Sequence, residues 1–148
     1  MATEAESQTQ GITAEELATR ANIVAIGTVR SMQSEWSSDR TKIVTKVTIA
    51  VDQYLKGSQQ DRTLTITVPG GEVDGAGELY SHVARFRQNE EVVVFAERDA
   101  GGTLRVTGGE QGKLSLTTER FSGKRVVGEG ELLEVFSTRV RGAVRNAQ

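Results

Sequence analysis

The alternation of apolar and polar residues in KIVTKVTIAVDQYLKG, residues 42–57, is the feature that most constrains the fold of this chain. Because successive side chains of a strand point to opposite faces, the pattern predicts one long strand with a buried face and a solvated face. The inward face is predicted to carry Ile43, Val47, Ile49, Val51 and Leu55. TLTITVP, residues 63–69, repeats the pattern, with Leu64, Ile66 and Val68 pointing inward.

Shorter apolar runs bounded by turn residues indicate the remaining strands. These runs are NIVAIGTV (22–29), EVVVFAE (91–97), TLRVTG (103–108) and KLSLTTE (113–119). EWSSDR, residues 35–40, is predicted to turn the chain between the first two strands. The sequence Asp-Ala-Gly-Gly at 99–102 is predicted to close a hairpin.

Two segments have helical patterns. Thr13 and Glu16 stand at capping-box spacing and predict a short helix over about 14–21. Near the C-terminus, apolar residues at helical spacing predict a helix that packs on the sheet: Leu132, Leu133, Phe136, Val140 and Val144. Residues 1–11 are almost wholly polar and are predicted to form a disordered tail, whereas residues 12–148 form a single domain.

Together these elements predict an all-β fold: a five- to six-stranded barrel of the oligonucleotide/oligosaccharide-binding (OB) type, with a short N-terminal helix and a C-terminal helix. Closure into a barrel removes exposed strand edges. An immunoglobulin-like sandwich is the alternative, but the Cys and Trp landmarks of true immunoglobulin domains are missing.

Composition excludes several kinds of chemistry. The 148 residues include no cysteine, which removes disulfides, thiolate nucleophiles and cysteine-based metal sites. His82 is the only histidine, so a histidine-based zinc site or a Ser-His-Asp triad lacks partners. A formal charge of −2 argues against non-specific nucleic-acid binding. No apolar run reaches the roughly 20 residues that span a bilayer.

Five segments resemble a family of small, uncharacterised bacterial domains found mostly in exported proteins: ANIVAIGTV (21–29), VDQYLKG (51–57), VPGGE (68–72), NEEVVVFAE (89–97) and GGEQGKL (108–114). The chain departs from the family pattern at Asn22, where the family has Asp, and at Gln88-Asn89, where it has Pro-Gly. These are turn and cap positions. The resemblance implies an OB-like barrel and an extracytoplasmic, exported protein whose leader is absent from this sequence, and a cytoplasmic location stays open.

A looser likeness is to the netrin-like barrel of tissue inhibitors of metalloproteinases. It is carried by a short helix, then IVAIGTV, then a long strand ending in YLKG. Those inhibitors bind the zinc of their target through an N-terminal cysteine, which this chain does not have, so their mechanism is not transferred.

Glycines are concentrated in VPGGEVDGAGE, residues 68–78, directly after a predicted strand. Their spacing matches neither a P-loop nor a dinucleotide fingerprint, and the nearby carboxylates would repel a phosphate. The same carboxylates, Glu72, Asp74 and Glu78, have the oxygen chemistry of calcium ligands but not the spacing of an EF-hand. The favoured interpretation is a connection in which glycine permits positive φ.

A second Gly-Gly-Glu, at 108–110, raises the hypothesis that Glu72 and Glu110 form a catalytic carboxylate pair. Nothing in the sequence places the two together, so turn or bulge roles are favoured. A hydrolase that uses His82 as a general base would need a deep polar pocket around that residue. We therefore predict no catalytic residue, no metal ligand and no cofactor.

The function predicted from the sequence is a non-catalytic module that binds a protein or another macromolecule through loops at one end of the barrel. One alternative is a single-stranded nucleic-acid-binding OB domain, which the scarcity of aromatic residues in the second and third strands argues against. Another is a proteinase-inhibitor-like domain. The predicted binding residues are Gly70, Gly71, Glu72, Asp74, Glu110 and Gln111.

Overall fold

The structure is a computed structural model that describes residues 11–57, 62–128 and 130–146. All but Gly11 of the predicted tail lies outside these residues. In chain order the elements are α2 (Ala14–Arg20), β1 (Ile23–Trp36), β2 (Ile43–Lys56), β3 (Thr63–Pro69), β4 (Gly71–Val73), β5 (Ala76–Glu78), β6 (Glu91–Arg98), β7 (Leu104–Val106), the 3-10 helix η1 (Gly109–Gly112), β8 (Lys113–Thr118), β9 (Arg125–Val127), β10 (Glu131–Leu132) and α3 (Leu133–Asn146).

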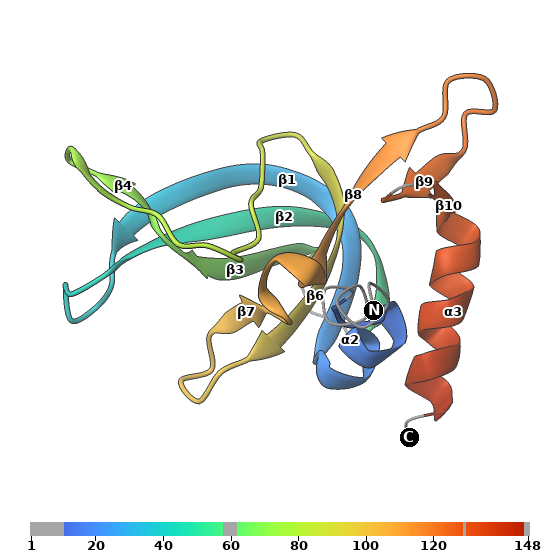
Figure 1. Cartoon of the computed structure of the whole chain (residues 1–148), viewed down its shortest axis with the longest axis horizontal. Coiled ribbons are helices and arrows are strands. Elements are labelled where there is room, and N and C mark those ends of the chain that lie inside the picture. The colour runs from blue at the N-terminus through green and yellow to red at the C-terminus, as the bar shows by residue number, and fades with distance from the viewer. Residues whose placement is uncertain (1–10, 58–61, 129, 147–148) are drawn as a thin grey trace, which may run out of the picture.

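The fold is mostly β, with one large antiparallel sheet and a helix near each end of the chain (Figure 1). Eight strands form this sheet in the order β10-β9-β8-β6-β1-β2-β3, and β7 also pairs with β6. β4 and β5 form a separate two-stranded ribbon. The predicted strands, the turn after β1 and the β6–β7 hairpin are confirmed, and α2 and α3 lie where the capping-box and helical spacings place them.

The long ribbon of β1 and β2 carries the sheet. Its register shifts between Val24 and Ala25, between Ile26 and Gly27, and between Val29 and Ser31. Bulges of this kind bend and twist a strand pair, and the ribbon is visibly curved in Figure 1.

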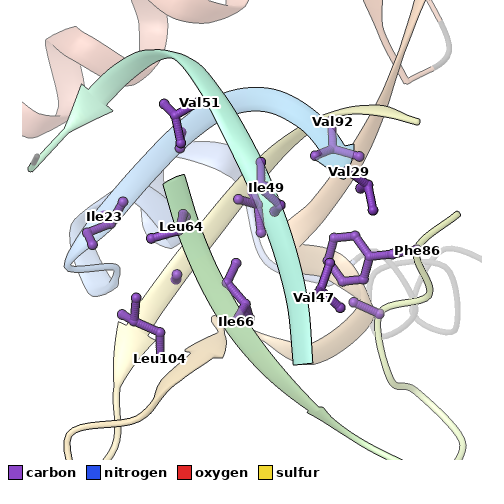
Figure 2. Packing of buried hydrophobic residues seen from close by; sticks show 14 of the residues in the cluster. Ile23, Val29, Val47, Ile49, Val51, Leu64, Ile66, Phe86, Val92 and Leu104 are labelled. Carbon is purple, nitrogen blue, oxygen red and sulfur yellow. The ribbon is translucent and has the colours of Figure 1, made fainter. Parts of the chain in front are cut away.

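Curvature gives the sheet two separate apolar clusters. Figure 2 shows the first, which fills the concave side of β1, β2, β3 and β6 and includes Ile49, Ile66 and Phe86. The second lies on the opposite face and packs the sheet against α2 and α3. The five predicted inward residues of β2 are all buried, but Leu55 belongs to the second cluster. The changes of register account for this change of face.

The predicted closed barrel of five or six strands is wrong. Among the described residues β3 pairs only with β2, so the sheet stays open at that edge. β7 lies beside β3, but it is only three residues long. Gly108 and Gly109, both at positive φ, then turn the chain into η1. Side chains, including Val83 and Ala84, line a hollow of about 300 Å³ between the two strands.

The strand count is also higher than predicted, because two short hairpins were not recognised. The β4–β5 hairpin lies within the glycine-rich stretch, and β9–β10 precedes α3. Leu132, predicted to be helical, is the last residue of β10.

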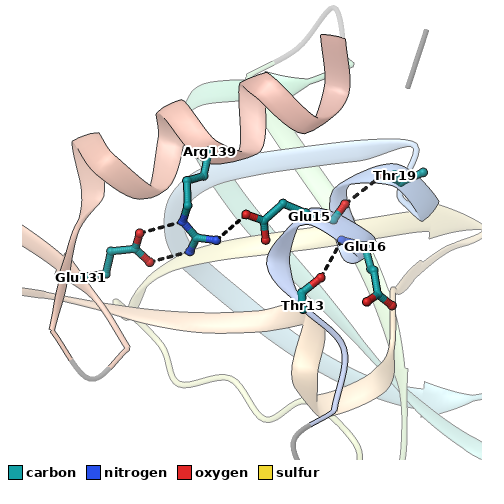
Figure 3. A network of polar contacts seen from close by, with 6 residues as sticks. All are labelled: Thr13, Glu15, Glu16, Thr19, Glu131 and Arg139. Atoms are coloured by element: carbon teal, nitrogen blue, oxygen red, sulfur yellow. Dashed lines mark hydrogen bonds and ion pairs between the residues drawn. The ribbon is translucent and has the colours of Figure 1, made fainter. Parts of the chain in front are cut away.

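A charged network joins the two helices (Figure 3). Arg139 on α3 donates to both carboxylate oxygens of Glu131 on β10, at 2.6 and 2.9 Å, and to Glu15 on α2 at 2.7 Å. Thr13 caps α2 by accepting a hydrogen bond from the backbone N–H of Glu16 at 3.1 Å, as its spacing predicts. None of the described helices has the length and hydropathy needed to cross a membrane.

Candidate functional site

Four of the six predicted binding residues lie at the β4–β5 hairpin. Asp74 and Gly75 both have positive φ, 49° and 84°, and form the two-residue turn between Val73 and Ala76. Turns of this geometry favour Asp-Gly because both central residues need φ > 0. Glu72 is exposed on β4. The glycine-rich stretch is therefore a tight hairpin, in agreement with the interpretation that its glycines permit positive φ.

Gly70 and Gly71 attach this hairpin to the β1–β2 ribbon. Thr45 donates a hydrogen bond to the carbonyl of Gly70 at 2.7 Å and shares another with Ser34 at 2.9 Å. A Cβ at Gly71 would stand 2.4 Å from Ser34 Oγ and 2.6 Å from Thr45 Oγ1. The two glycines therefore have a packing role, which the absence of a side chain makes possible.

Glu110 and Gln111 lie elsewhere, in η1. Glu110 pairs with His82 Nδ1 at 3.1 Å, and its backbone N–H donates to the His82 carbonyl. Gln111 accepts a hydrogen bond from the backbone N–H of Ile12. Figure 1 places β4 at one end of the molecule, away from the turn between β7 and β8. The six residues therefore do not form one site.

The His82 side chain is 84% exposed, the opposite of the enclosed position that a hydrolase with this general base requires. Its backbone has φ 60°, and its carbonyl holds the chain against η1 through Glu110. His82 and Glu110 thus connect two segments at the surface.

A larger feature opens on the concave side of the ribbon. We call it the ribbon groove. It has a volume of about 980 Å³ and lies between β1, β2, the β4–β5 hairpin and the segment 79–90. Its lining residues are Met32, Thr45, Val47, 68–72, 78–80, 83–87, Glu90, Lys113 and 115–117.

Apolar side chains are exposed along the ribbon groove. Leu79 is 80% exposed, Met32 41% and Tyr80 39%. The Tyr80 hydroxyl donates to Glu78 Oε1 at 2.9 Å, and the same oxygen accepts from the backbone N–H of Ile43. Hydrogen bonding to Glu78 raises the pKa of Tyr80. Glu78 therefore fixes the start of the segment to β2 and orients the Tyr80 ring.

Lys113 and Glu90 form a charged pair at the other end of the groove, where their side chains are 13% and 17% exposed. Lys113 and Ser115 each donate to Glu90 Oε2 at 2.7 Å. Burial raises the pKa of Glu90, but these hydrogen bonds outweigh it and hold the pKa below its usual value. Lys113 Nζ also stands 5.6 Å from the centre of the Phe86 ring. Lys113 is therefore neutralised within the chain.

The segment 79–90 also carries two arginines whose positive charges have no partner of opposite charge. Arg85 and Arg87 are exposed and line the groove on either side of the buried Phe86. In the part of the chain that the structure describes, neither guanidinium forms an ion pair or a hydrogen bond. Glu72 is likewise exposed and unpaired among the described side chains. Glu78 forms hydrogen bonds but no ion pair among the described residues, so the unbalanced charges of the groove are two cations, Arg85 and Arg87, and two anions, Glu72 and Glu78.

Sequence reasoning identified Gly70, Gly71 and Glu72 but missed the segment that forms the groove wall. The segment LYSHVARF, residues 79–86, has mixed periodicity, and it lies between the predicted strands without being assigned to any element. The alternation of Ala84 and Phe86 with Arg85 and Arg87 was an available signal, since it indicates an extended segment with a buried face and a cationic face.

The described residues hold no group of three or more His, Asp or Glu side chains placed to bind a metal ion. No protein-family model matches the chain, and no curated protein sequence matches it. Function therefore has to be inferred from the geometry of the molecule itself.

Proposed function

We propose that the protein is a non-catalytic binding module that holds a segment of a partner protein in the ribbon groove. The observation that carries this proposal is the combination of exposed Met32, Leu79 and Tyr80 with the unpaired Arg85 and Arg87 in one groove. Met, Tyr and Arg are enriched at protein interfaces, and apolar groups that gather in a concave site mark interaction surfaces.

The charges of the groove select the occupant. An apolar side chain of the partner packs on Leu79 and Tyr80, and a carboxylate nearby pairs with Arg85 or Arg87. The partner segment is therefore apolar with an adjacent acidic residue. Glu72 and Glu78 at the hairpin disfavour a second acid at that end of the groove. Because the sheet that carries the groove is open, the likeness to an OB barrel is a likeness of architecture only.

Selection of peptides from a random display library tests the proposal. Enriched sequences should combine an apolar residue with an acidic one, and binding should be weakened about tenfold or more by Leu79→Ser or by Arg87→Gln. Phe121→Ser is the matched control, because Phe121 is 97% exposed but lies outside the groove.

Three results would contradict the proposal: no enrichment, peptides that bind Leu79→Ser as well as the unchanged chain, or equal losses in Phe121→Ser. Salt-dependent retention of single-stranded DNA that requires Arg85 and Arg87 would instead support the nucleic-acid alternative. Inhibition of a metalloproteinase that depends on Leu79 would identify the partner class as a proteinase.

A further inference from the structure

A second hollow, separate from the ribbon groove, lies where β9 and β10 meet α3. We call it the α3 hollow. It has a volume of about 550 Å³, and the polar residues that line it include Lys124, Arg125, Glu134, Ser137, Thr138 and Arg141. None of these residues lines the ribbon groove. Figure 1 shows this region at the end of α3, below the loop that joins β8 to β9.

The cations of the α3 hollow are only partly neutralised. Arg125 stands 3.2 Å from Glu91 and 3.7 Å from Asp52. Lys124 and Arg141 are exposed, and neither side chain has a hydrogen bond or an ion pair within the described ranges. Glu134 is the one acid among the described lining residues. Lys124 and Arg141 are therefore the two cations of the hollow that have no carboxylate partner among the described residues.

α3 supplies further hydrogen-bond donors at the α3 hollow. Residues 134, 137, 138 and 141 stand at spacings of three and four, so they share one face of α3. No described side chain hydrogen-bonds to the backbone N–H groups of residues 133–135, which have no intrahelical partner at the start of α3. These N–H groups and the positive end of the helix dipole favour an anion.

A buried hydroxyl points to a ligand independently of the helix terminus. Ser137 is 7% exposed and lines the hollow, yet its hydroxyl has no hydrogen bond in the described part of the chain. The hydroxyl is therefore available to a ligand in the hollow, since no group of the described chain occupies it. Thr138 differs, because its hydroxyl donates to the Glu134 carbonyl at 3.0 Å.

We propose that the α3 hollow binds a phosphate group, held by Lys124 and Arg141, the Ser137 hydroxyl and the first turn of α3. A phosphate presents several acceptor oxygens around one centre, and this arrangement of cations, hydroxyl and backbone N–H groups supplies donors from several directions. A carboxylate has fewer acceptors and leaves part of the set unused. Glu134 opposes the anion and limits its affinity.

Titration of the full chain with inorganic pyrophosphate, followed by calorimetry and amide chemical shifts, tests the proposal. Binding should shift the amides of residues 133–138 and weaken as salt is added. Arg141→Gln should weaken it about tenfold. Arg145→Gln is the matched control, since Arg145 is an exposed arginine of the same helix that does not line the hollow.

Glu134→Gln should bind pyrophosphate about threefold more tightly, because an opposing charge is removed. A gain of affinity cannot come from misfolding, so this variant keeps the test decisive. The proposal is overturned if pyrophosphate leaves the amides of residues 133–138 unchanged, or if Arg145→Gln loses as much affinity as Arg141→Gln.

A parallel experiment distinguishes a soluble phosphate from a lipid headgroup. Phosphatidylcholine vesicles containing phosphatidic acid retain the protein if the site takes a headgroup, and pyrophosphate then competes. Phe121→Ser should reduce that retention, because Phe121 is 97% exposed on the loop beside Lys124. Pyrophosphate binding without vesicle retention assigns the site to a soluble phosphate. Failure of the peptide selection leaves both results standing, since the two sites share no residues.

Discussion

The two halves of β1 differ in what covers them. The paired half, Ile23–Val29, lies between β2 and β6, and every residue except Thr28 is buried. The free half, Ser31–Trp36, continues beyond β6, pairs only with β2 and is exposed or half-buried. One strand therefore serves as the centre of the core and then as a support of the ribbon groove, the proposed binding surface.

The difference between the halves explains their sequences. The paired half separates the two apolar clusters, so the side chains on both faces of the strand must be apolar. The free half has solvent on one side and carries Ser, Gln and Glu. It also supports the ribbon groove through Met32 and the β4–β5 hairpin through Ser34. Stability is thus expected to depend on the paired half, whereas the proposed binding role belongs to the free half.

The largest expected effect comes from removing an aromatic ring beside the paired half. Phe95 is fully buried on β6, and its ring meets Phe136 of α3 edge to face at 6.3 Å. Phe95→Ala should lower the free energy of unfolding by about 3–5 kcal/mol, measured by urea denaturation, because it leaves a cavity between the sheet and α3.

Met32→Ala provides the contrast in the free half. Met32 is 41% exposed, so its loss should change stability by less than about 0.5 kcal/mol. A cost of several kcal/mol at Met32 would mean that the free half belongs to the core, and the comparison would fail.

The number of faces that a strand buries also determined how much of its packing the sequence could predict. β2 and β3 showed clean alternation because each buries mainly one face, and their predicted inward residues are all buried, although Leu55 lies in the cluster on the opposite face. The run VVVF in β6 is buried on both faces, and it predicts a strand without indicating which partners flank it. The open edge at β3 depends on how short β7 is, which local periodicity does not reveal.

The candidate site was harder to predict for a related reason. Gly70 and Gly71 were predicted as binding residues because they lie in a glycine-rich loop, but glycine marks backbone geometry and does not indicate a groove. The ribbon groove joins Met32, Leu79 and Lys113, which are far apart in the chain. Their segments meet because β1 pairs with β2 and β6, β6 pairs with β8, and the β4–β5 hairpin docks on β2.

An intermediate effect is expected where the hairpin docks on the free half. Gly71→Ala places a Cβ against Ser34 and Thr45 at a φ of 133°, which should cost about 1–3 kcal/mol and release the hairpin from the ribbon. Gly77→Ala is the matched control in the same hairpin, because its nearest neighbour is 3.8 Å away.

Amide hydrogen exchange measures this release locally. In Gly71→Ala, protection should fall in residues 70–78 and persist in β6, since opening of the hairpin does not require the core to unfold. Equal loss of protection in β6 would show that the hairpin and the core unfold together, contrary to the separation of the two halves.

The smallest effect concerns the turn at the tip of the free half. Asp39 Oδ1 accepts hydrogen bonds from Ser37 Oγ at 2.6 Å, from Thr41 Oγ1 at 2.7 Å and from the Thr41 backbone N–H at 3.1 Å. These bonds lower the pKa of Asp39 to about 2. Because the folded pKa lies below that of the unfolded chain, the stabilisation is complete above about pH 4 and is lost as the pH falls through about 2.

The amide shift of Thr41 should therefore titrate with a midpoint near pH 2, and in Asp39→Asn this titration should disappear because the side chain no longer ionises. The turn is fully exposed, so its loosening should leave amide protection in the paired half unchanged over the same pH range. If protection of Ile23–Val29 instead fell in step with the Thr41 shift, the ribbon would be one cooperative unit. The free half could then not adapt to a bound segment without disturbing the core.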